Sequence, residues 1–175
     1  NINQGGGEMA TMSNGRLFEK VGVNISTVYG ELSNEAIQMM TESKNLPHLK
    51  ENPSFWASGI SLVAHMQNPH LPAVHMNTRM FWTKGAWWFG GGADLNPCIE
   101  DPLDTKHFHA IQKKYCDKHD LRFYPKYKDW ADKYFYVPHR KRNRGVGGIF
   151  FDEHNTGNWE NDFAFVQDVG RAFLP

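Results

Sequence analysis

Apolar and polar positions alternate with a period of two along several stretches of the chain, which is typical of β-strands. The clearest stretches are 59–65 and 73–82, and a break rich in proline and asparagine separates them at 68–72. Shorter alternating or apolar runs occur before and after them. We therefore expect strands over 21–29, 59–65, 73–82, 86–89 and 147–152, with the strand at 86–89 ending at Gly90-Gly91-Gly92.

A period of three to four residues replaces this alternation elsewhere and predicts helices. Phe108, Ile111 and Tyr115 form an apolar stripe, so we expect a helix from an Asp104 cap to about His119. Three more helices are expected: one through Ala36, Ile37 and Met40 capped by Ser33 or Asn34, one over 128–136 ended by Pro138, and one through Phe163, Val166 and Val169 capped by Asn158. Strands in a run, followed by helices mixed with strands, indicate an α+β fold.

Composition narrows the class of protein. The 175 residues are 40% apolar and 22% charged, which suits a single domain, 1–175, with a buried core. The formal net charge of zero argues against a nucleic-acid binder, and no apolar run is long enough to span a bilayer. Two cysteines exclude a disulfide scaffold and fit a reducing, cytoplasmic location.

Polar side chains gather on one face of the two central strands, because alternate residues of a strand point to the same side. Ser61 and His65 share one face of 59–65, while His75, Asn77 and Arg79 share one face of 73–82. The other face of 73–82 is mostly apolar. This pattern is compatible with a binding site on a rigid sheet, and equally with the solvated face of a half-exposed antiparallel sheet.

The remaining histidines give weaker signals. His107 and His109 fall on opposite flanks of the apolar helix stripe, so periodicity does not choose between them. His139 follows a helix end, where the helix dipole favours a cation. His48, His70, His119 and His154 are expected at the surface. No HExxH motif occurs, so any metal site would have to be assembled from distant segments.

Neither glycine run is a nucleotide-binding loop. The run at 90–92 lacks the P-loop lysine, and the glycines at 145–148 precede a strand instead of a helix, which favours close backbone approach or a turn. Asp94 follows the first run and is expected to lie exposed at the mouth of a site. The basic run 139–144 is either a solvated loop or a carboxylate clamp that uses Arg140 or Arg144.

Several segments, in order along nearly the whole chain, resemble oxygen-dependent coproporphyrinogen III oxidases, with the bacterial members most similar. The most specific are HMNTR at 75–79 and WWFGGGADL at 87–95. Six more accompany them: GGGEM at 5–9, FEKVGV at 18–23, GISLVAH at 59–65, YPKYK at 124–128, YFYVPHR at 134–140 and RGVGGIFFD at 144–152.

The resemblance implies a large, flat antiparallel sheet with helices on both faces, in a homodimer. It implies an enzyme of haem biosynthesis that uses O2 to decarboxylate two propionates of coproporphyrinogen III, giving protoporphyrinogen IX. No organic cofactor is expected, and a divalent metal such as manganese is expected only in bacterial-type members. Against the family, this chain lacks an N-terminal helical segment and a C-terminal stretch with further substrate and dimer contacts.

The resemblance also assigns residues. Ser61, Asn77 and Arg79 bind substrate, and His75 is the proton donor. The metal ligands would be His65, His75, His109 and His139. The chemistry of the substrate adds Arg144 as a carboxylate partner and Asp94 as a catalytic acceptor of pyrrole N–H groups.

Two alternatives remain open from the sequence. One is a non-haem metal-dependent oxidase or hydrolase that uses His65 and His75. The other is a non-catalytic tetrapyrrole carrier.

Overall fold

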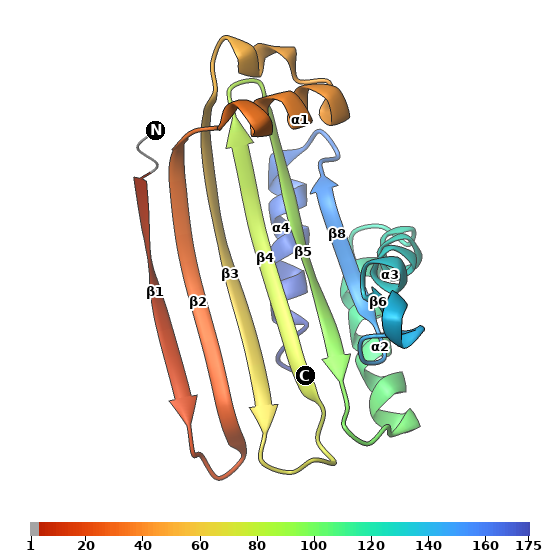
Figure 1. The fold of residues 1–175 in the computed structure, drawn as a ribbon. Coiled ribbons are helices and arrows are strands. Elements are labelled where there is room, and N and C mark those ends of the chain that lie inside the picture. Colours follow the sequence, from red (N-terminus) through yellow and green to blue (C-terminus); the bar gives the residue numbers. More distant parts are fainter. Residues whose placement is uncertain (1–3) are drawn as a thin grey trace.

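A computed structural model describes residues 4–175. Six strands form one antiparallel sheet in the order β1-β2-β3-β4-β5-β8, so the first five strands are neighbours both in sequence and in space (Figure 1). The strands are β1 (Gln4–Ser13), β2 (Phe18–Glu31), β3 (Ser54–Met66), β4 (Ala73–Thr83), β5 (Ala86–Asn96) and β8 (Gly148–His154). Two short strands, β6 (Tyr136–Val137) and β7 (Arg142–Asn143), pair separately.

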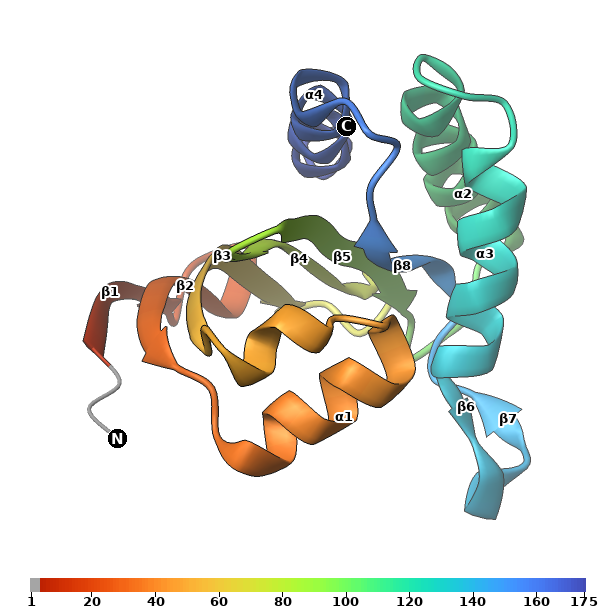
Figure 2. The same ribbon diagram turned by 90° about the horizontal axis from the view of Figure 1, so that it is seen from above.

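Helices lie on both sides of the large sheet. The helices are α1 (Asn34–Lys44), α2 (Pro102–Asp117), α3 (Phe123–Tyr134) and α4 (Trp159–Arg171), with short 3₁₀ turns η1 (Pro47–Lys50) and η2 (Pro138–Arg140). Figure 2 shows α1 on one side of the sheet and α4 with α2 on the other. The α+β class and the helix-flanked antiparallel sheet expected from the sequence are confirmed. Among residues 4–175, no helix is both long and apolar enough to cross a membrane.

The glycine run Gly90–Gly92 continues β5 instead of ending it, so the strand expected at 86–89 is longer than predicted. These glycines sit in a central strand where the neighbouring backbones come close. A Cβ atom on Gly91 would lie 2.7 Å from the Asn77 carbonyl oxygen, and one on Gly92 would lie 2.5 Å from that of Ile149. Glycine in this strand is therefore a packing requirement and not a turn signal.

Strand β1 was not expected, because its sequence QGGGEMATMS is rich in glycine and poor in β-branched residues. It forms through a continuous antiparallel register with β2, from Gln4 opposite Tyr29 to Ser13 opposite Lys20. Backbone pairing with the neighbouring strand thus overrides the weak local preference.

Helix starts were predicted with mixed success. Ser33 caps α1 and Asn158 caps α4, as expected. The cap of α2 is Asp101 and not Asp104, since the Asp101 carboxylate accepts the Leu103 backbone N–H at 2.7 Å. Helix α3 begins at Phe123, five residues before the expected 128, because Pro125 is tolerated in a first turn where no intrahelical N–H is needed.

The main core lies between the sheet and α2, α3 and α4. Phe89, Ile149 and Phe151 of the sheet are buried in one cluster with five side chains of these helices: Cys116, Tyr127, Phe165, Val166 and Val169.

His154, expected at the surface, is also buried here. Its Nδ1 accepts a hydrogen bond from the Tyr127 hydroxyl at 2.6 Å, and its Nε2 lies 2.9 Å from Asp162. The prediction was wrong because β8 extends to His154 and carries it under α4.

Candidate functional site

The face of the sheet that faces α1, here called the α1 face, carries the polar residues predicted from strand parity. In the register, Ser61 lies opposite Asn77, and Asn77 lies opposite Gly92 on its other side. Arg79 lies between Gly59 and Gly90. Side chains of directly opposed residues project to the same side, so glycines border the polar side chains on the α1 face. This leaves open space above Asn77 and Arg79.

That space is a cavity of about 630 Å³ on the α1 face. Ser61, Asn77 and Arg79 all line it, as the sequence predicts. Its walls are apolar and aromatic near α1, and they include Val28, Met40, Phe81 and Trp88. The Phe81 and Trp88 rings stack with centroids 4.5 Å apart. The cavity therefore combines one polar, cationic region with one apolar region, which suits an amphiphilic anion.

Arg79 is held in place by two polar contacts. Its Nη1 donates to the Asn77 side-chain oxygen at 3.0 Å, and its Nη2 lies 3.3 Å from an oxygen of Asp152. The backbone of Gly90 lies beneath this pair. A Cβ atom there would be 2.8 Å from both the Arg79 guanidinium carbon and the Asp152 carboxylate. The missing side chain at Gly90 thus leaves room for the ion pair.

A second polar cluster continues along the same face of β4. His75 is two residues from Asn77, about 7 Å along the strand, and its Nδ1 is 2.9 Å from an Asp94 oxygen. The other Asp94 oxygen accepts hydrogen bonds from Asn96 at 2.7 Å and from Arg144 Nε at 3.0 Å. The Arg144 guanidinium also lies 4.4 Å from the Phe135 ring centroid.

Asp94 is not exposed at the mouth of a site, which corrects the expectation from the sequence. Its side chain has no exposed surface, because β5 continues through this position and β8 covers it. Burial alone would raise the pKa of the Asp94 carboxyl, but hydrogen bonds from His75 and Asn96 and the Arg144 charge outweigh it and lower the pKa. Asp94 is therefore a buried anion that accepts hydrogen bonds from protein donors, and two of its partners, His75 and Arg144, are themselves partly exposed.

The four histidines assigned to a metal do not come together. His65 and His139 are exposed, in β3 and η2. Both ring nitrogens of His109 have protein partners: Nδ1 is 3.0 Å from the Tyr124 hydroxyl, and Nε2 is 3.0 Å from the Val146 carbonyl. Residues 4–175 contain no group of three or more His, Cys, Asp or Glu that could hold a metal ion. These donors do not fit a divalent ion within this part of the chain, and the metal role stays a prediction of the resemblance.

Periodicity did not choose between His107 and His109, but the structure distinguishes them. His109 faces α3 and is half-buried, whereas His107 is exposed, with its Nε2 3.4 Å from the Pro175 carbonyl.

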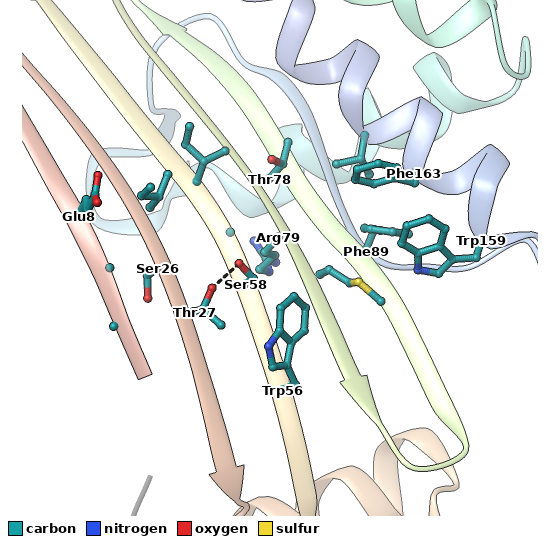
Figure 3. Close-up of a pocket in the computed structure, with 17 residues that line it drawn as sticks. Glu8, Ser26, Thr27, Trp56, Ser58, Thr78, Arg79, Phe89, Trp159 and Phe163 are labelled. Carbon is teal, nitrogen blue, oxygen red and sulfur yellow. Dashed lines mark hydrogen bonds between the residues drawn. The ribbon is translucent and has the colours of Figure 1, made fainter. Parts of the chain in front are cut away.

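The opposite face of the sheet has a cavity of its own, between the strands and α4 (Figure 3). It has a volume of about 720 Å³, and aromatic side chains of β3, β5 and α4 line it: Trp56, Phe89, Trp159 and Phe163. Of the residues predicted for the site, only Arg79 belongs to it. The side chains of Thr27 and Ser58 hydrogen-bond to each other at 2.8 Å at its floor.

Two residues of the α1-face cavity were missed from the sequence. Asp152 ends the expected strand 147–152. Lys44 follows the last apolar residue named for the expected helix, Met40, and no role was expected for it. The alternation of side chains along a strand places Asp152 on the same face as Gly148. The sequence does not indicate, however, that this strand pairs with β5.

Comparison with known proteins identifies the family of this chain. A family model described as coproporphyrinogen III oxidase matches residues 1–175. The chain is 51% identical over 172 residues to the oxygen-dependent coproporphyrinogen-III oxidase of Rickettsia africae (strain ESF-5), and over 170 residues to that of Rickettsia bellii (strain RML369-C). These matches cover 98% and 97% of this chain, and the chain spans 59% and 58% of the length of these curated relatives. The chain therefore belongs to the coproporphyrinogen III oxidase family.

Proposed function

We propose that this protein catalyses the O2-dependent oxidative decarboxylation of two propionates of coproporphyrinogen III to vinyl groups, giving protoporphyrinogen IX in haem biosynthesis. The observation that carries the proposal is the α1-face cavity, where Ser61, Asn77 and Arg79 lie together in a chain that belongs to this family.

The substrate is a flexible tetrapyrrole with four carboxylates, so it needs cations and apolar surface in one place. Arg79 supplies a planar cation suited to bidentate contact with a carboxylate. Asn77 and Ser61 add hydrogen-bonding groups beside it, and Phe81 and Trp88 provide aromatic surface for a pyrrole ring. Arg144 would meet a carboxylate only with the part of its guanidinium that does not bind Asp94.

The reaction of each propionate balances without a further oxidant. One CH2CH2COO⁻ group, one O2 and one proton give one vinyl group, one CO2 and one H2O2. O2 adds to a carbon of the electron-rich pyrrole, and the resulting peroxide takes a β-hydrogen as a proton and leaves as H2O2 with one further proton. CO2 then leaves, and the electron pair of its C–C bond stays behind to form the vinyl double bond. A proton must leave the pyrrole nitrogen in this sequence.

We assign His75 to accept that proton, and the protonated ring is then the proton donor that the resemblance implies. Its Nδ1 faces Asp94, so Nε2 is the nitrogen that would meet the substrate. Asp94 itself has no exposed surface, so it acts through His75, orienting the ring and offsetting positive charge, and not as a direct acceptor of pyrrole N–H groups.

The proposal requires no organic cofactor, and none of its steps passes through a metal. It includes a homodimer, as the resemblance implies.

An assay with coproporphyrinogen III in air and under strict anaerobiosis tests the function. We expect CO2 and protoporphyrinogen IX in air and neither without O2. Binding of the porphyrinogen with no release of CO2 in air would instead identify a carrier. Turnover that chelation abolishes, with stoichiometric iron or zinc in the pure protein, would favour the metal-dependent alternative.

A further inference from the structure

The α1-face cavity is lined by a second cation besides Arg79. Lys44, the last residue of α1, reaches it from the helix that bounds the apolar end of the cavity. Its ammonium lies 5.0 Å from the centroid of the Trp88 ring, which is itself a wall of the cavity. A cation over an aromatic face is stabilised without being neutralised, so its charge stays available to an anion.

The two cations are held by consecutive carboxylates of β8. Phe151 pairs with Gly91 and His154 pairs with Phe89, so Asp152 and Glu153 together lie opposite Gly90 in a β-bulge. Glu153 has a φ of 56°, in the left-handed region that bulges use. The bulge directs Asp152 to Arg79 and Glu153 to Lys44, and each carboxylate forms an ion pair there.

The Lys44–Glu153 pair is asymmetric. The Lys44 side chain is 18% exposed, whereas the Glu153 side chain is 56% exposed and does not line the cavity. An ion pair with a largely exposed partner contributes little to stability, so a ligand carboxylate can replace that partner. Lys44 lines the cavity together with Met40 and Trp88.

We propose that Lys44 binds a second carboxylate of the substrate, at the α1 end of the cavity, while Arg79 binds the first. This inference rests on the proposed function, since it names a further contact for the same polycarboxylate. Two cations in one cavity, separated by aromatic walls, select a ligand with carboxylates on opposite sides of an apolar body. The bulge carboxylates keep both cations in place when no ligand is bound.

The test compares Lys44→Met, Glu153→Gln and, as a matched control, Lys50→Met, whose lysine lies in η1 and does not line the cavity. For each variant we measure KM and kcat with coproporphyrinogen III, and the Kd of coproporphyrin III from quenching of tryptophan fluorescence. The porphyrin has the same four carboxylates but cannot react. We expect Lys44→Met to raise both constants about tenfold, with kcat changed less, because one charge-assisted contact is lost. Lys44→Arg should restore most of the affinity.

Glu153→Gln distinguishes a role of Lys44 in ligand binding from a role in holding α1 against β8. If Lys44 binds the ligand, Glu153→Gln leaves KM and Kd unchanged or lowers them, because it removes a competitor for the ammonium. If Lys44 serves only to join α1 to β8, both variants raise the constants alike, and the inference is overturned. If Lys44→Met lowers the melting temperature, Lys44→Gln gives the same comparison, because it removes the charge and keeps a polar end on the side chain.

The outcome also distinguishes the two proposals. A wild-type protein that neither binds coproporphyrin III nor releases CO2 refutes the proposed function. A wild-type protein that does both, with Lys44→Met behaving as Lys50→Met, refutes only the role of Lys44.

Discussion

Arg79 is the side chain on which the α1-face cavity depends most, since it combines a fixed charge with contacts to Asn77 and Asp152. We predict that Arg79→Ala raises KM for coproporphyrinogen III about tenfold or more. A hydrogen bond to a charged group contributes about 1.5–3 kcal/mol, and about 1.4 kcal/mol corresponds to a factor of ten. Arg122→Ala is the control, because Arg122 is exposed, pairs with Asp120 and does not line the cavity. An unchanged KM would show that Arg79 does not bind the substrate.

His75 carries the predicted proton transfer, and its role can be separated from metal binding. A positioned acid or base typically contributes a factor of about 10² to 10⁴ in rate. We predict that His75→Ala lowers kcat by a factor in this range, equally in chelator-treated buffer and with added manganese.

One outcome would contradict the role of His75 in proton transfer. If His75 is only a metal ligand, chelation brings the wild type down to the rate of His75→Ala, and alanine substitutions of His65, His109 and His139 show the same metal-dependent loss. The proton-transfer role must then be abandoned.

Asp94 should act on rate more than on binding, because it touches His75 and has no exposed surface. We predict that Asp94→Asn lowers kcat by a larger factor than it raises KM. The measurement is a full kinetic comparison with Asn96→Ala, which removes a different hydrogen bond to the same carboxylate. Equal changes in KM and melting temperature, with kcat preserved, would show that Asp94 is only a structural anion.

At the scale of the element, the glycines of β5 have two different purposes. A Cβ at Gly90 would meet only the ends of flexible side chains, those of Arg79 and Asp152, whereas a Cβ at Gly92 would meet the Ile149 backbone. Side-chain ends move away at low cost, and the backbone of a central strand does not.

We therefore predict opposite phenotypes for two matched substitutions. Gly90→Ala should raise KM several-fold with little change in stability, because it displaces Arg79. Gly92→Ala should destabilise the fold by about 1–3 kcal/mol, the usual cost of overpacking. Chemical unfolding and kinetics on both variants check this. Equal loss of stability in the two would mean that Arg79 and Asp152 cannot adjust.

At the scale of the whole molecule, one buried network joins three elements. His154 of β8 contacts Tyr127 of α3 and Asp162 of α4, and the Thr156 hydroxyl also donates to Asp162 at 2.7 Å. Burial lowers the pKa of His154, outweighing the opposite effect of Asp162, and burial raises the pKa of Tyr127. A neutral imidazole accepts from Tyr127 at Nδ1, whereas Nε2 lies 2.9 Å from an Asp162 oxygen without hydrogen-bond geometry.

This network makes stability depend on pH in a defined direction. The pKa of His154 is lower in the folded than in the unfolded protein, so the unfolded chain binds the proton more readily. The contribution of His154 to the free energy of unfolding is therefore full at pH values above the pKa of an unfolded histidine, about 6.5, and is lost as the pH falls below that value. The charges near the ring are Asp162, Lys126 and His119, and Lys126 and His119 oppose protonation.

We predict that the free energy of unfolding falls between pH 7 and pH 5, and that His154→Gln removes this slope while lowering stability at pH 7. Urea unfolding at several pH values measures both. Asp94 and Asp168, whose pKa values are lowered, would act only near pH 4 and below. A slope that persists in His154→Gln would assign the acid sensitivity to other groups.

The sequence by itself determined the features that depend on local periodicity. The two-residue period placed Ser61, Asn77 and Arg79 on one sheet face, because a strand has no other way to arrange alternate side chains. Side-chain capping at Ser33 and Asn158 is equally local, since it involves backbone groups within three residues. The family motifs around them are contiguous and were therefore readable as well.

Only the tertiary structure decided the features that arise where distant segments pair. The glycines of 90–92 continue a strand because β4 and β8 flank them, and this same pairing buries Asp94. His154 is buried because α4 folds back over β8. Lys44 and Asp152 line the same cavity although they are 108 residues apart in the sequence. Such contacts depend on which strands become neighbours, and the energy of that choice comes from the packed sheet and helices as a whole and not from any local pattern.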